Sequence, residues 1–160
     1  MKKKIEGRVR RLGHDIHVDQ IKEGLGMAVD LFSRDSTAKT GGHTVNPKST
    51  AIIIAGRNFG RGRDEADTIT EIKAFGIGGI VASSFGRDFF RDAVNHGLAV
   101  VESTEAFEAI ADGESISIDI ENSEIACLKG PIKIAGFPEI FTKIYHSGGL
   151  IPYARKLLGK

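Results

Sequence analysis

The sequence predicts an α/β fold in which a mixed, mostly parallel β-sheet is flanked by helices. Through residue 111, short apolar runs alternate with helix-like segments, and most of the connections between them are short. This alternation implies parallel strand pairing through right-handed crossovers. After residue 114 the chain changes to apolar–polar alternation, which is typical of antiparallel strands with one solvent-facing side. Because the 160 residues contain no internal repeat and no linker, we expect one domain over residues 1–160.

The expected elements follow the chain in order. A strand at 5–12 ends at the turn Gly13-His14-Asp15, and a second strand at 15–21 follows it. Residues 25–32 are a candidate short helix, and residues 33–49 are a long loop, a type of segment that is usually functional or disordered in a compact domain. Further strands are expected at 50–55, 79–83, 98–101, 115–120, 125–128 and 132–135. Helices are expected at 64–75, 87–96, 104–111 and 138–158, the last interrupted by Gly148-Gly149 and by Pro152.

Composition and charge exclude several classes of function. The net charge of +1 gives no global field, so nucleic-acid and membrane partners are not expected. The single cysteine, Cys127, allows no internal disulfide, and the chain cannot hold an iron–sulfur cluster or a structural zinc through its own thiolates. Cys127 lies in an apolar run and is expected to be a small buried hydrophobe. Without an apolar signal segment or a membrane-length apolar window, the protein is expected to be cytoplasmic.

The most informative segment is the glycine-rich turn at residues 56–65, which joins a strand-like run to a helix-like run. Its three glycines allow a sharp turn and a close approach to a ligand, and the arginines within it indicate an anion. Asp64 and Glu65 stand in the expected first helical turn, where they would repel a phosphate, so a nucleotide is disfavoured. The alternative is that the arginines only solvate a tight turn.

Alternate residues of the expected second strand, Asp15, His17 and Asp19, resemble a metal site. Three ligands on one strand spread by roughly 6–7 Å per pair of residues, so a solvated or cleft-lining strand face is the favoured interpretation and no metal is expected. Two serines precede expected helices, and both are candidate N-caps: Ser84 and Ser103.

Four segments together resemble the small, swivelling-domain subunits of the aconitase superfamily, most closely the 3-isopropylmalate dehydratase small subunits. Gly13-His14-Asp15-Ile16-His17-Val18-Asp19 is similar to the family's Gly-Asp-Asn-Ile-Asp-Thr-Asp. Residues 55–62, Ala-Gly-Arg-Asn-Phe-Gly-Arg-Gly, are similar to its Gly-x-Asn-Phe-Gly-Cys-Gly turn. Residues 83–98 and 147–153 are similar to its Ser-Phe-Ala-Arg run and its C-terminal tail, so the resemblance covers nearly the whole chain.

The resemblance implies a β/β/α swivelling domain and a hydro-lyase acting in leucine biosynthesis. It further implies a separate large subunit that carries a [4Fe-4S] cluster, while this chain binds no cofactor of its own. Such enzymes remove and re-add water on a hydroxy di- or tricarboxylic acid, with the cluster as Lewis acid and a base that takes the adjacent C–H proton. The isolated chain is expected to be able to form homo-oligomers.

The sequence departs from the family after the glycine-rich turn. The family has Ser-Ser-Arg-Glu-His there, and this chain has Arg63-Asp64-Glu65-Ala66-Asp67. Aligned without a gap, Arg63 replaces the family's catalytic serine and Glu65 replaces its carboxylate-binding arginine. In the first motif, His14 replaces an acidic residue. Neither the base nor the carboxylate clamp can therefore be transferred from the family.

Two accounts follow. In the first, which we adopt, the site is rewired: Arg61 or Arg63 binds a substrate carboxylate next to Asp15, and Asp64, Glu65 or His14 takes the proton. In the second, the chain keeps the fold and the subunit interface as an interaction or regulatory subunit and has lost the chemistry. A stand-alone anion-binding module is a further alternative.

The family's mobile loop, which reads the substrate's side group, corresponds to residues within 25–44. Its apolar side chains favour a substrate with an alkyl group over one with a third carboxylate, although core packing explains them equally well. The candidate substrate-binding residues of this loop are Met27, Val29 and Leu31.

Overall fold

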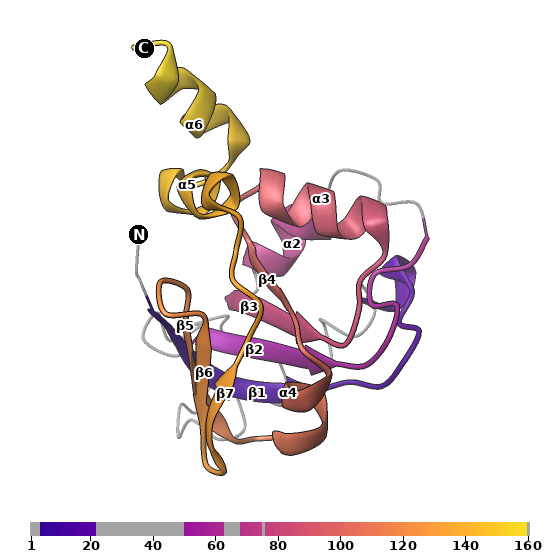
Figure 1. Ribbon diagram of the computed structural model, residues 1–160. Coiled ribbons are helices and arrows are strands. Elements are labelled where there is room, and N and C mark those ends of the chain that lie inside the picture. Colours follow the sequence, from indigo (N-terminus) through magenta and orange to yellow (C-terminus); the bar gives the residue numbers. More distant parts are fainter. Residues whose placement is uncertain (1–3, 22–49, 63–67, 75, 160) are drawn as a thin grey trace, which may run out of the picture.

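The computed structural model describes residues 4–21, 50–62, 68–74 and 76–159 (Figure 1). Within them, one sheet has the strand order β4-β3-β2-β1-β5-β6-β7. The strands are β1 (Lys4–Arg11), β2 (Thr50–Ala55), β3 (Ile77–Ala82), β4 (Ala99–Glu102), β5 (Ser115–Asp119), β6 (Glu124–Cys127) and β7 (Gly130–Lys133). The helices are α2 (Thr68–Ala74), α3 (Arg87–Asn95), α4 (Thr104–Ala109), α5 (Glu139–Ser147) and α6 (Leu150–Leu157).

The sheet has a parallel half and an antiparallel half. β1, β2, β3 and β4 pair in parallel, so their carboxyl ends lie at one edge of the sheet. β1 also pairs antiparallel with β5, and β6 and β7 continue this meander. The mixed α/β fold predicted from the sequence is therefore confirmed. The prediction that the sheet is mostly parallel was wrong, since three of the described strand pairs are parallel and three are antiparallel.

Both faces of β2, β3 and β4 are buried, which explains their continuous apolar runs. β1, at the border of the two halves, alternates between exposed and buried residues instead. In β2, Ile53 packs with α2 and α3 on one face, and Ile52 and Ile54 pack with α4 and the meander on the other. β5 instead alternates, since Ile116 and Ile118 are buried between more exposed neighbours. The hydrophobic pattern of each strand thus follows how many of its faces are buried.

The C-terminal helical segment is divided by a glycine elbow, as predicted. α5 ends at Gly148, which has a φ of 91°, and α6 begins after Gly149, with a φ of 136°. Pro152 does not interrupt α6, contrary to the prediction, because it lies in the first turn, where a backbone N–H has no helical partner. Figure 1 shows α6 extending away from the body of the domain.

Three local predictions were wrong. Residues 15–21 do not form a strand: His17 makes one isolated bridge, and a helical turn begins at Val18. Ser84 does not cap α3, whose N-cap is Gly86, whereas Ser103 does cap α4 by accepting from the Ala106 N–H. Cys127 is half-buried rather than buried, and its thiol donates to the Gly130 carbonyl.

No helix among the described residues is long and apolar enough to cross a membrane. The expected helix at 64–75 is described only as α2, since its first residues lie outside the described ranges, as do the candidate helix at 25–32 and the loop at 33–49.

Candidate active site

Three connections meet at the carboxyl ends of the parallel strands, and together they form what we call the site edge: residues 13–18 after β1, 56–61 after β2 and 83–86 after β3. Main-chain hydrogen bonds join the three connections. In each of the following pairs the N–H of the first residue donates to the carbonyl of the second: Gly56 to Gly13 (3.1 Å), Asp15 to Arg57 (2.7 Å), Gly60 to Ile16 (2.8 Å), Phe59 to Ser84 (3.0 Å) and Gly86 to Phe59 (2.9 Å). The carboxyl ends of parallel strands are the usual location of ligand sites in open α/β sheets.

A cluster of three phenylalanine side chains packs beneath the backbone of the site edge, inside the core. Phe59 is fully buried and meets Phe85 and Phe89 edge-on, with ring centroids 6.1 and 5.4 Å apart. Gly60 has a φ of 79°, and a Cβ atom there would collide with the ring of Phe89. The glycine at this position is therefore required both by the backbone conformation and by the close packing of α3.

Two polar residues hold the turns against each other. Asp15 and Asn58 both have a φ of 56°, a conformation that Asp and Asn tolerate better than most residues. The Asn58 Nδ2 donates to Asp15 Oδ1 at 3.0 Å, and the Asn58 backbone N–H donates to Ser84 Oγ at 2.9 Å. Asn58 thus fastens the glycine-rich turn to both of its neighbours.

The site edge presents two arginines and one carboxylate. Arg61 Nη1 lies 3.8 Å from Asp15 Oδ1, and both side chains are about half exposed. The hydrogen bond from Asn58 holds the pKa of Asp15 below its usual range, and the positive charges of Arg61 and Arg57 act in the same direction. Asp15 is therefore ionised at neutral pH. Its single negative charge faces the two positive charges of Arg57 and Arg61.

The His14 side chain is oriented by a hydrogen bond and a ring contact. Its Nδ1 accepts from the Arg57 backbone N–H at 2.9 Å, and its ring tilts against that of Phe107, with centroids 5.0 Å apart. Arg11 lies over the same phenyl ring, 4.2 Å from its centroid, and donates to the carbonyl oxygens of Phe107 and Ile110. An imidazole that accepts at Nδ1 carries its proton on Nε2, so His14 offers a hydrogen-bond donor to the site.

The expected alternating face of Asp15, His17 and Asp19 does not form, because the chain turns into a helix at His17. The Gln20 side chain accepts from the His17 N–H at 2.8 Å, and His17 Nδ1 accepts from the Asp19 N–H at 3.2 Å. These reciprocal bonds resemble a capping box, which starts a helix. Among the described residues, no group of three or more His, Cys, Asp and Glu is placed to hold a metal ion.

Of the residues predicted for catalysis and substrate binding, the structure brings three together: His14, Asp15 and Arg61. The others lie outside the described residues: Arg63, Asp64, Glu65, Met27, Val29 and Leu31. Sequence reasoning did not select Arg57, Asn58 or Ser84, although Arg57 and Asn58 stand inside the glycine-rich turn. The Gly-Arg-Asn-Phe-Gly segment at 56–60 was the available signal for Arg57 and Asn58.

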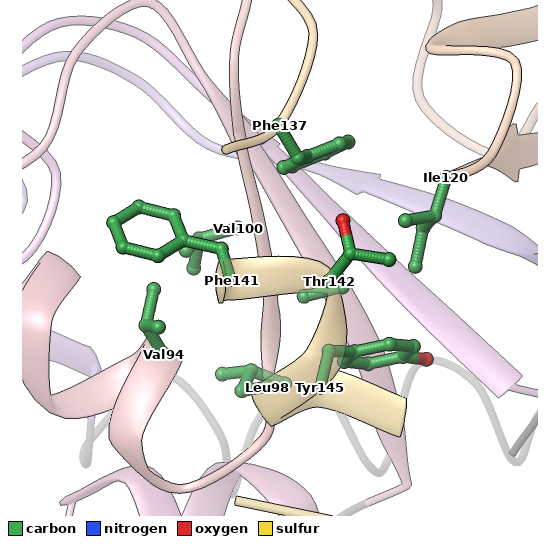
Figure 2. Close-up of a pocket in the computed structure, with 9 residues that line it drawn as sticks. Val94, Leu98, Val100, Ile120, Phe137, Phe141, Thr142 and Tyr145 are labelled. Atoms are coloured by element: carbon green, nitrogen blue, oxygen red, sulfur yellow. The ribbon is translucent and has the colours of Figure 1, made fainter. Parts of the chain in front are cut away.

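A small cavity lies at the other end of α3, between α3, β4 and α5. Its volume is about 30 Å³, and Figure 2 shows Val94, Phe141 and Tyr145 among the side chains that surround it. A cavity of this size and apolar character has room for a water molecule and not for a dicarboxylic acid. Its lining also contains no basic side chain that could bind a carboxylate, so it is not a second candidate for the substrate site.

Comparison with known proteins identifies the family. Residues 33–106 match the family described as aconitase C-terminal domain. The chain is 31% identical, over 99% of its length and 98% of the relative, to the 3-isopropylmalate dehydratase small subunit of Aquifex aeolicus. It is 41% identical to that of Caldanaerobacter subterraneus, over 68% of this chain and 69% of the relative.

A solved structure agrees with these relatives. The crystal structure of 3-isopropylmalate dehydratase from Methanocaldococcus jannaschii superposes with a TM-score of 0.74 and 28% identity, covering 98% of this chain and 97% of that one. The resemblance and the fold predicted from the motifs are thereby confirmed. The chain belongs to the family of 3-isopropylmalate dehydratase small subunits, which are hydro-lyase subunits of the aconitase superfamily.

Proposed function

We propose that this chain joins a larger subunit to dehydrate and rehydrate a small 2-hydroxy dicarboxylic acid. The names of its relatives support this function: they are 3-isopropylmalate dehydratase small subunits and, in Methanocaldococcus jannaschii, an isopropylmalate/citramalate isomerase small subunit. The observation that carries the proposal is the site edge itself. It gathers two guanidinium groups, one carboxylate and one oriented imidazole at the carboxyl ends of the parallel strands.

The arginines are assigned to substrate carboxylates. Arg61 is held by Asp15 only at 3.8 Å in an exposed pair, an arrangement that contributes little to stability. A substrate carboxylate can replace it with two parallel N–H···O bonds, which are shorter and stronger. Among the described residues Arg57 makes no ion pair, so its guanidinium can bind the second carboxylate. Asp15, once replaced, keeps the hydrogen bond that it accepts from Asn58.

His14 is assigned the donor role. Its Nε2–H points away from the bond that Nδ1 accepts and can donate to the hydroxyl oxygen or to a carboxylate of the substrate. The dehydration breaks a C–H bond and the neighbouring C–O bond: a base takes the C–H proton, and the C–H electron pair forms the carbon–carbon double bond. The hydroxyl leaves as water after it takes a proton from a donor, the role assigned to His14. We keep Asp64 and Glu65 as the candidates for that base, with Arg63 as a further carboxylate ligand.

The iron–sulfur cluster is assigned to the large subunit. This chain has one cysteine, whose thiol already donates to the Gly130 carbonyl in the β6–β7 hairpin. A cubane cluster needs several thiolates, so the residues of this chain do not fit it. No step of the chemistry assigned here passes through it. The cytoplasm remains the compartment we expect, and an alkyl-bearing substrate remains the class that Met27, Val29 and Leu31 favour.

Coexpression with the large subunit of the same organism tests this function. The purified pair is incubated under anaerobic conditions with hydroxy acids that differ in their side group, and the unsaturated product is followed by its absorbance. We expect turnover of a dicarboxylate with an alkyl side group and none of a tricarboxylate. Turnover of the tricarboxylate alone would contradict the substrate class. A pair that assembles and turns over neither acid would contradict the hydro-lyase.

A further inference from the structure

The C-terminal helix α6 has an apolar stripe that the domain does not cover. Leu150, Tyr153, Ala154, Leu157 and Leu158 recur at the spacing of one helix face. At the start of the stripe, Leu150 and Tyr153 are partly covered by the rest of the domain. At its end, Leu157 and Leu158 are solvent-exposed, with 69% and 73% of their surface accessible. No residue of α6 is buried. An eight-residue helix is marginal in water, because helices of this length are stabilised by packing.

The direction of α6 is fixed at its base by the glycine elbow that joins it to α5. The α5 helix ends in two capping bonds, from Gly148 N–H to the Tyr145 carbonyl and from Gly149 N–H to the Ile144 carbonyl, the pattern of a Schellman motif. This elbow is pressed against the end of α3. A Cβ atom on Gly97 would lie 2.7 Å from the Gly148 carbonyl carbon, and one on Gly149 would lie 2.8 Å from the Asn95 carbonyl oxygen.

The charges on α6 disfavour a second copy of this chain as the occupant of the stripe. Its last turn carries Arg155 and Lys156, and its first turn has no acidic residue. In a two-fold pair of antiparallel helices, each basic turn would face the other helix's N-terminus, which is also positive. A different protein, with acidic side chains around an apolar groove, has the complementary charge.

The position of α6 relative to the site edge favours the large subunit as the protein that covers the stripe. The α3 helix begins next to Gly86 of the site edge and ends at the elbow, so about 13 Å of helix separates the two. A partner that closes the site over Arg61 needs to span α3 to reach the base of α6, and the exposed end of the stripe lies about 12 Å of helix further on (Figure 1). We infer that α6 is the docking helix for the large subunit, with its apolar stripe seated in a groove rimmed by acidic residues. This inference rests on the proposed function.

The test measures binding of the full chain to the purified large subunit by calorimetry under anaerobic conditions. The Leu157→Asp/Leu158→Asp variant places charges on the exposed end of the stripe. Its matched control is Leu128→Asp, because Leu128 is 85% exposed on the β6–β7 turn, far along the sheet from α6. We expect the double variant to bind at least tenfold more weakly and Leu128→Asp to bind as the wild type does. Unchanged thermal unfolding would show that both variants are folded.

A charge-reversal pair tests the nature of the groove. Arg155→Glu/Lys156→Glu should weaken binding severalfold at low salt, and the difference should shrink at high salt as screening removes it. Lys129→Glu/Lys133→Glu on the β6–β7 hairpin is the control and should bind the large subunit as the wild type does.

Equal binding by wild type and Leu157→Asp/Leu158→Asp would overturn the docking role while leaving the proposed function intact. A wild-type chain that binds no large subunit would overturn both the docking role and the proposed function. If the wild-type chain forms a dimer and Leu157→Asp/Leu158→Asp dissociates it, the stripe belongs to an interface between two copies of this chain, and the docking role is overturned.

Discussion

The Nδ1 atom of His14 accepts a hydrogen bond from the backbone N–H of Arg57 at 2.9 Å, across 43 positions of sequence. The two residues belong to different connections of the site edge, after β1 and after β2. A Cβ atom on the intervening Gly56 would collide with the imidazole, so the ring, the glycine and the amide fit together as one unit. The bond fixes the His14 tautomer and points Nε2–H outward.

The first prediction concerns this tautomer. Two-dimensional ¹⁵N–¹H spectra should show His14 with its proton on Nε2 at a pH where the ring is neutral. His14→Ala should lower the unfolding free energy by about 0.5–1.5 kcal/mol, the usual net worth of one hydrogen bond. A proton on Nδ1 in the spectra would contradict the donor role that we assign to His14.

The second prediction separates packing from backbone conformation at Gly60. Gly60→Ala places a methyl group against the Phe89 ring and forces a non-glycine residue to a φ of 79°. Gly113→Ala is the matched control, since Gly113 has a φ of 82° and nothing within 4 Å of the added Cβ. The left-handed conformation should lower the unfolding free energy of both variants by about 1–2 kcal/mol. Overpacking should lower that of Gly60→Ala by about 1–3 kcal/mol more. Urea unfolding of the two variants measures this difference, and equal losses would contradict the packing argument.

The third prediction concerns substrate binding by Arg61. A charge-assisted hydrogen bond is worth about 1.5–3 kcal/mol, so Arg61→Ala should raise KM roughly ten- to hundredfold in the reconstituted enzyme. Arg61→Lys should recover only part of this loss, because an ammonium group cannot bind a carboxylate in the bidentate manner. Lys133→Ala removes an exposed cation from the far edge of the sheet and should leave KM unchanged. The assignment fails if Arg61→Ala and Lys133→Ala behave alike.

The fourth prediction concerns stability at high pH. Burial between α5 and the sheet raises the pKa of Tyr145 above its usual value of 10.0. The phenol therefore ionises more readily in the unfolded chain, and the unfolding free energy should fall as pH rises above about 10. Tyr145→Phe should reduce this fall, measured by urea unfolding at pH 8 and at successively higher pH. An identical pH dependence in both proteins would show that Tyr145 is not responsible.

The fold was largely predictable from the sequence because its signals are local. Buried parallel strands such as 50–55 are continuous apolar runs, and Ser103 precedes its helix as an N-cap does. The error at Pro152 arose from treating proline as an interruption without regard to its position. In the first turn of a helix it removes no hydrogen bond.

The site was less predictable because it is built from long-range contacts. Alternation at 15–21 indicated a strand, yet the bonds among His17, Asp19 and Gln20 start a helix there. The role of Ser84 could not be read from its neighbours, since its hydroxyl accepts from Asn58, 26 residues away. The charges that gather at the site edge belong to separate connections, and only the strand order brings them together.

The central claim is that this chain completes a hydro-lyase. The most direct measurement follows a 2-hydroxy dicarboxylic acid by ¹H NMR under anaerobic conditions, with the large subunit alone, with both subunits, and with both subunits carrying Arg61→Ala. We predict that the hydroxyl group migrates to the neighbouring carbon only when both subunits are present, and much more slowly with Arg61→Ala. Equal migration with the large subunit alone would contradict the claim, as would an assembled pair in which the hydroxyl never moves.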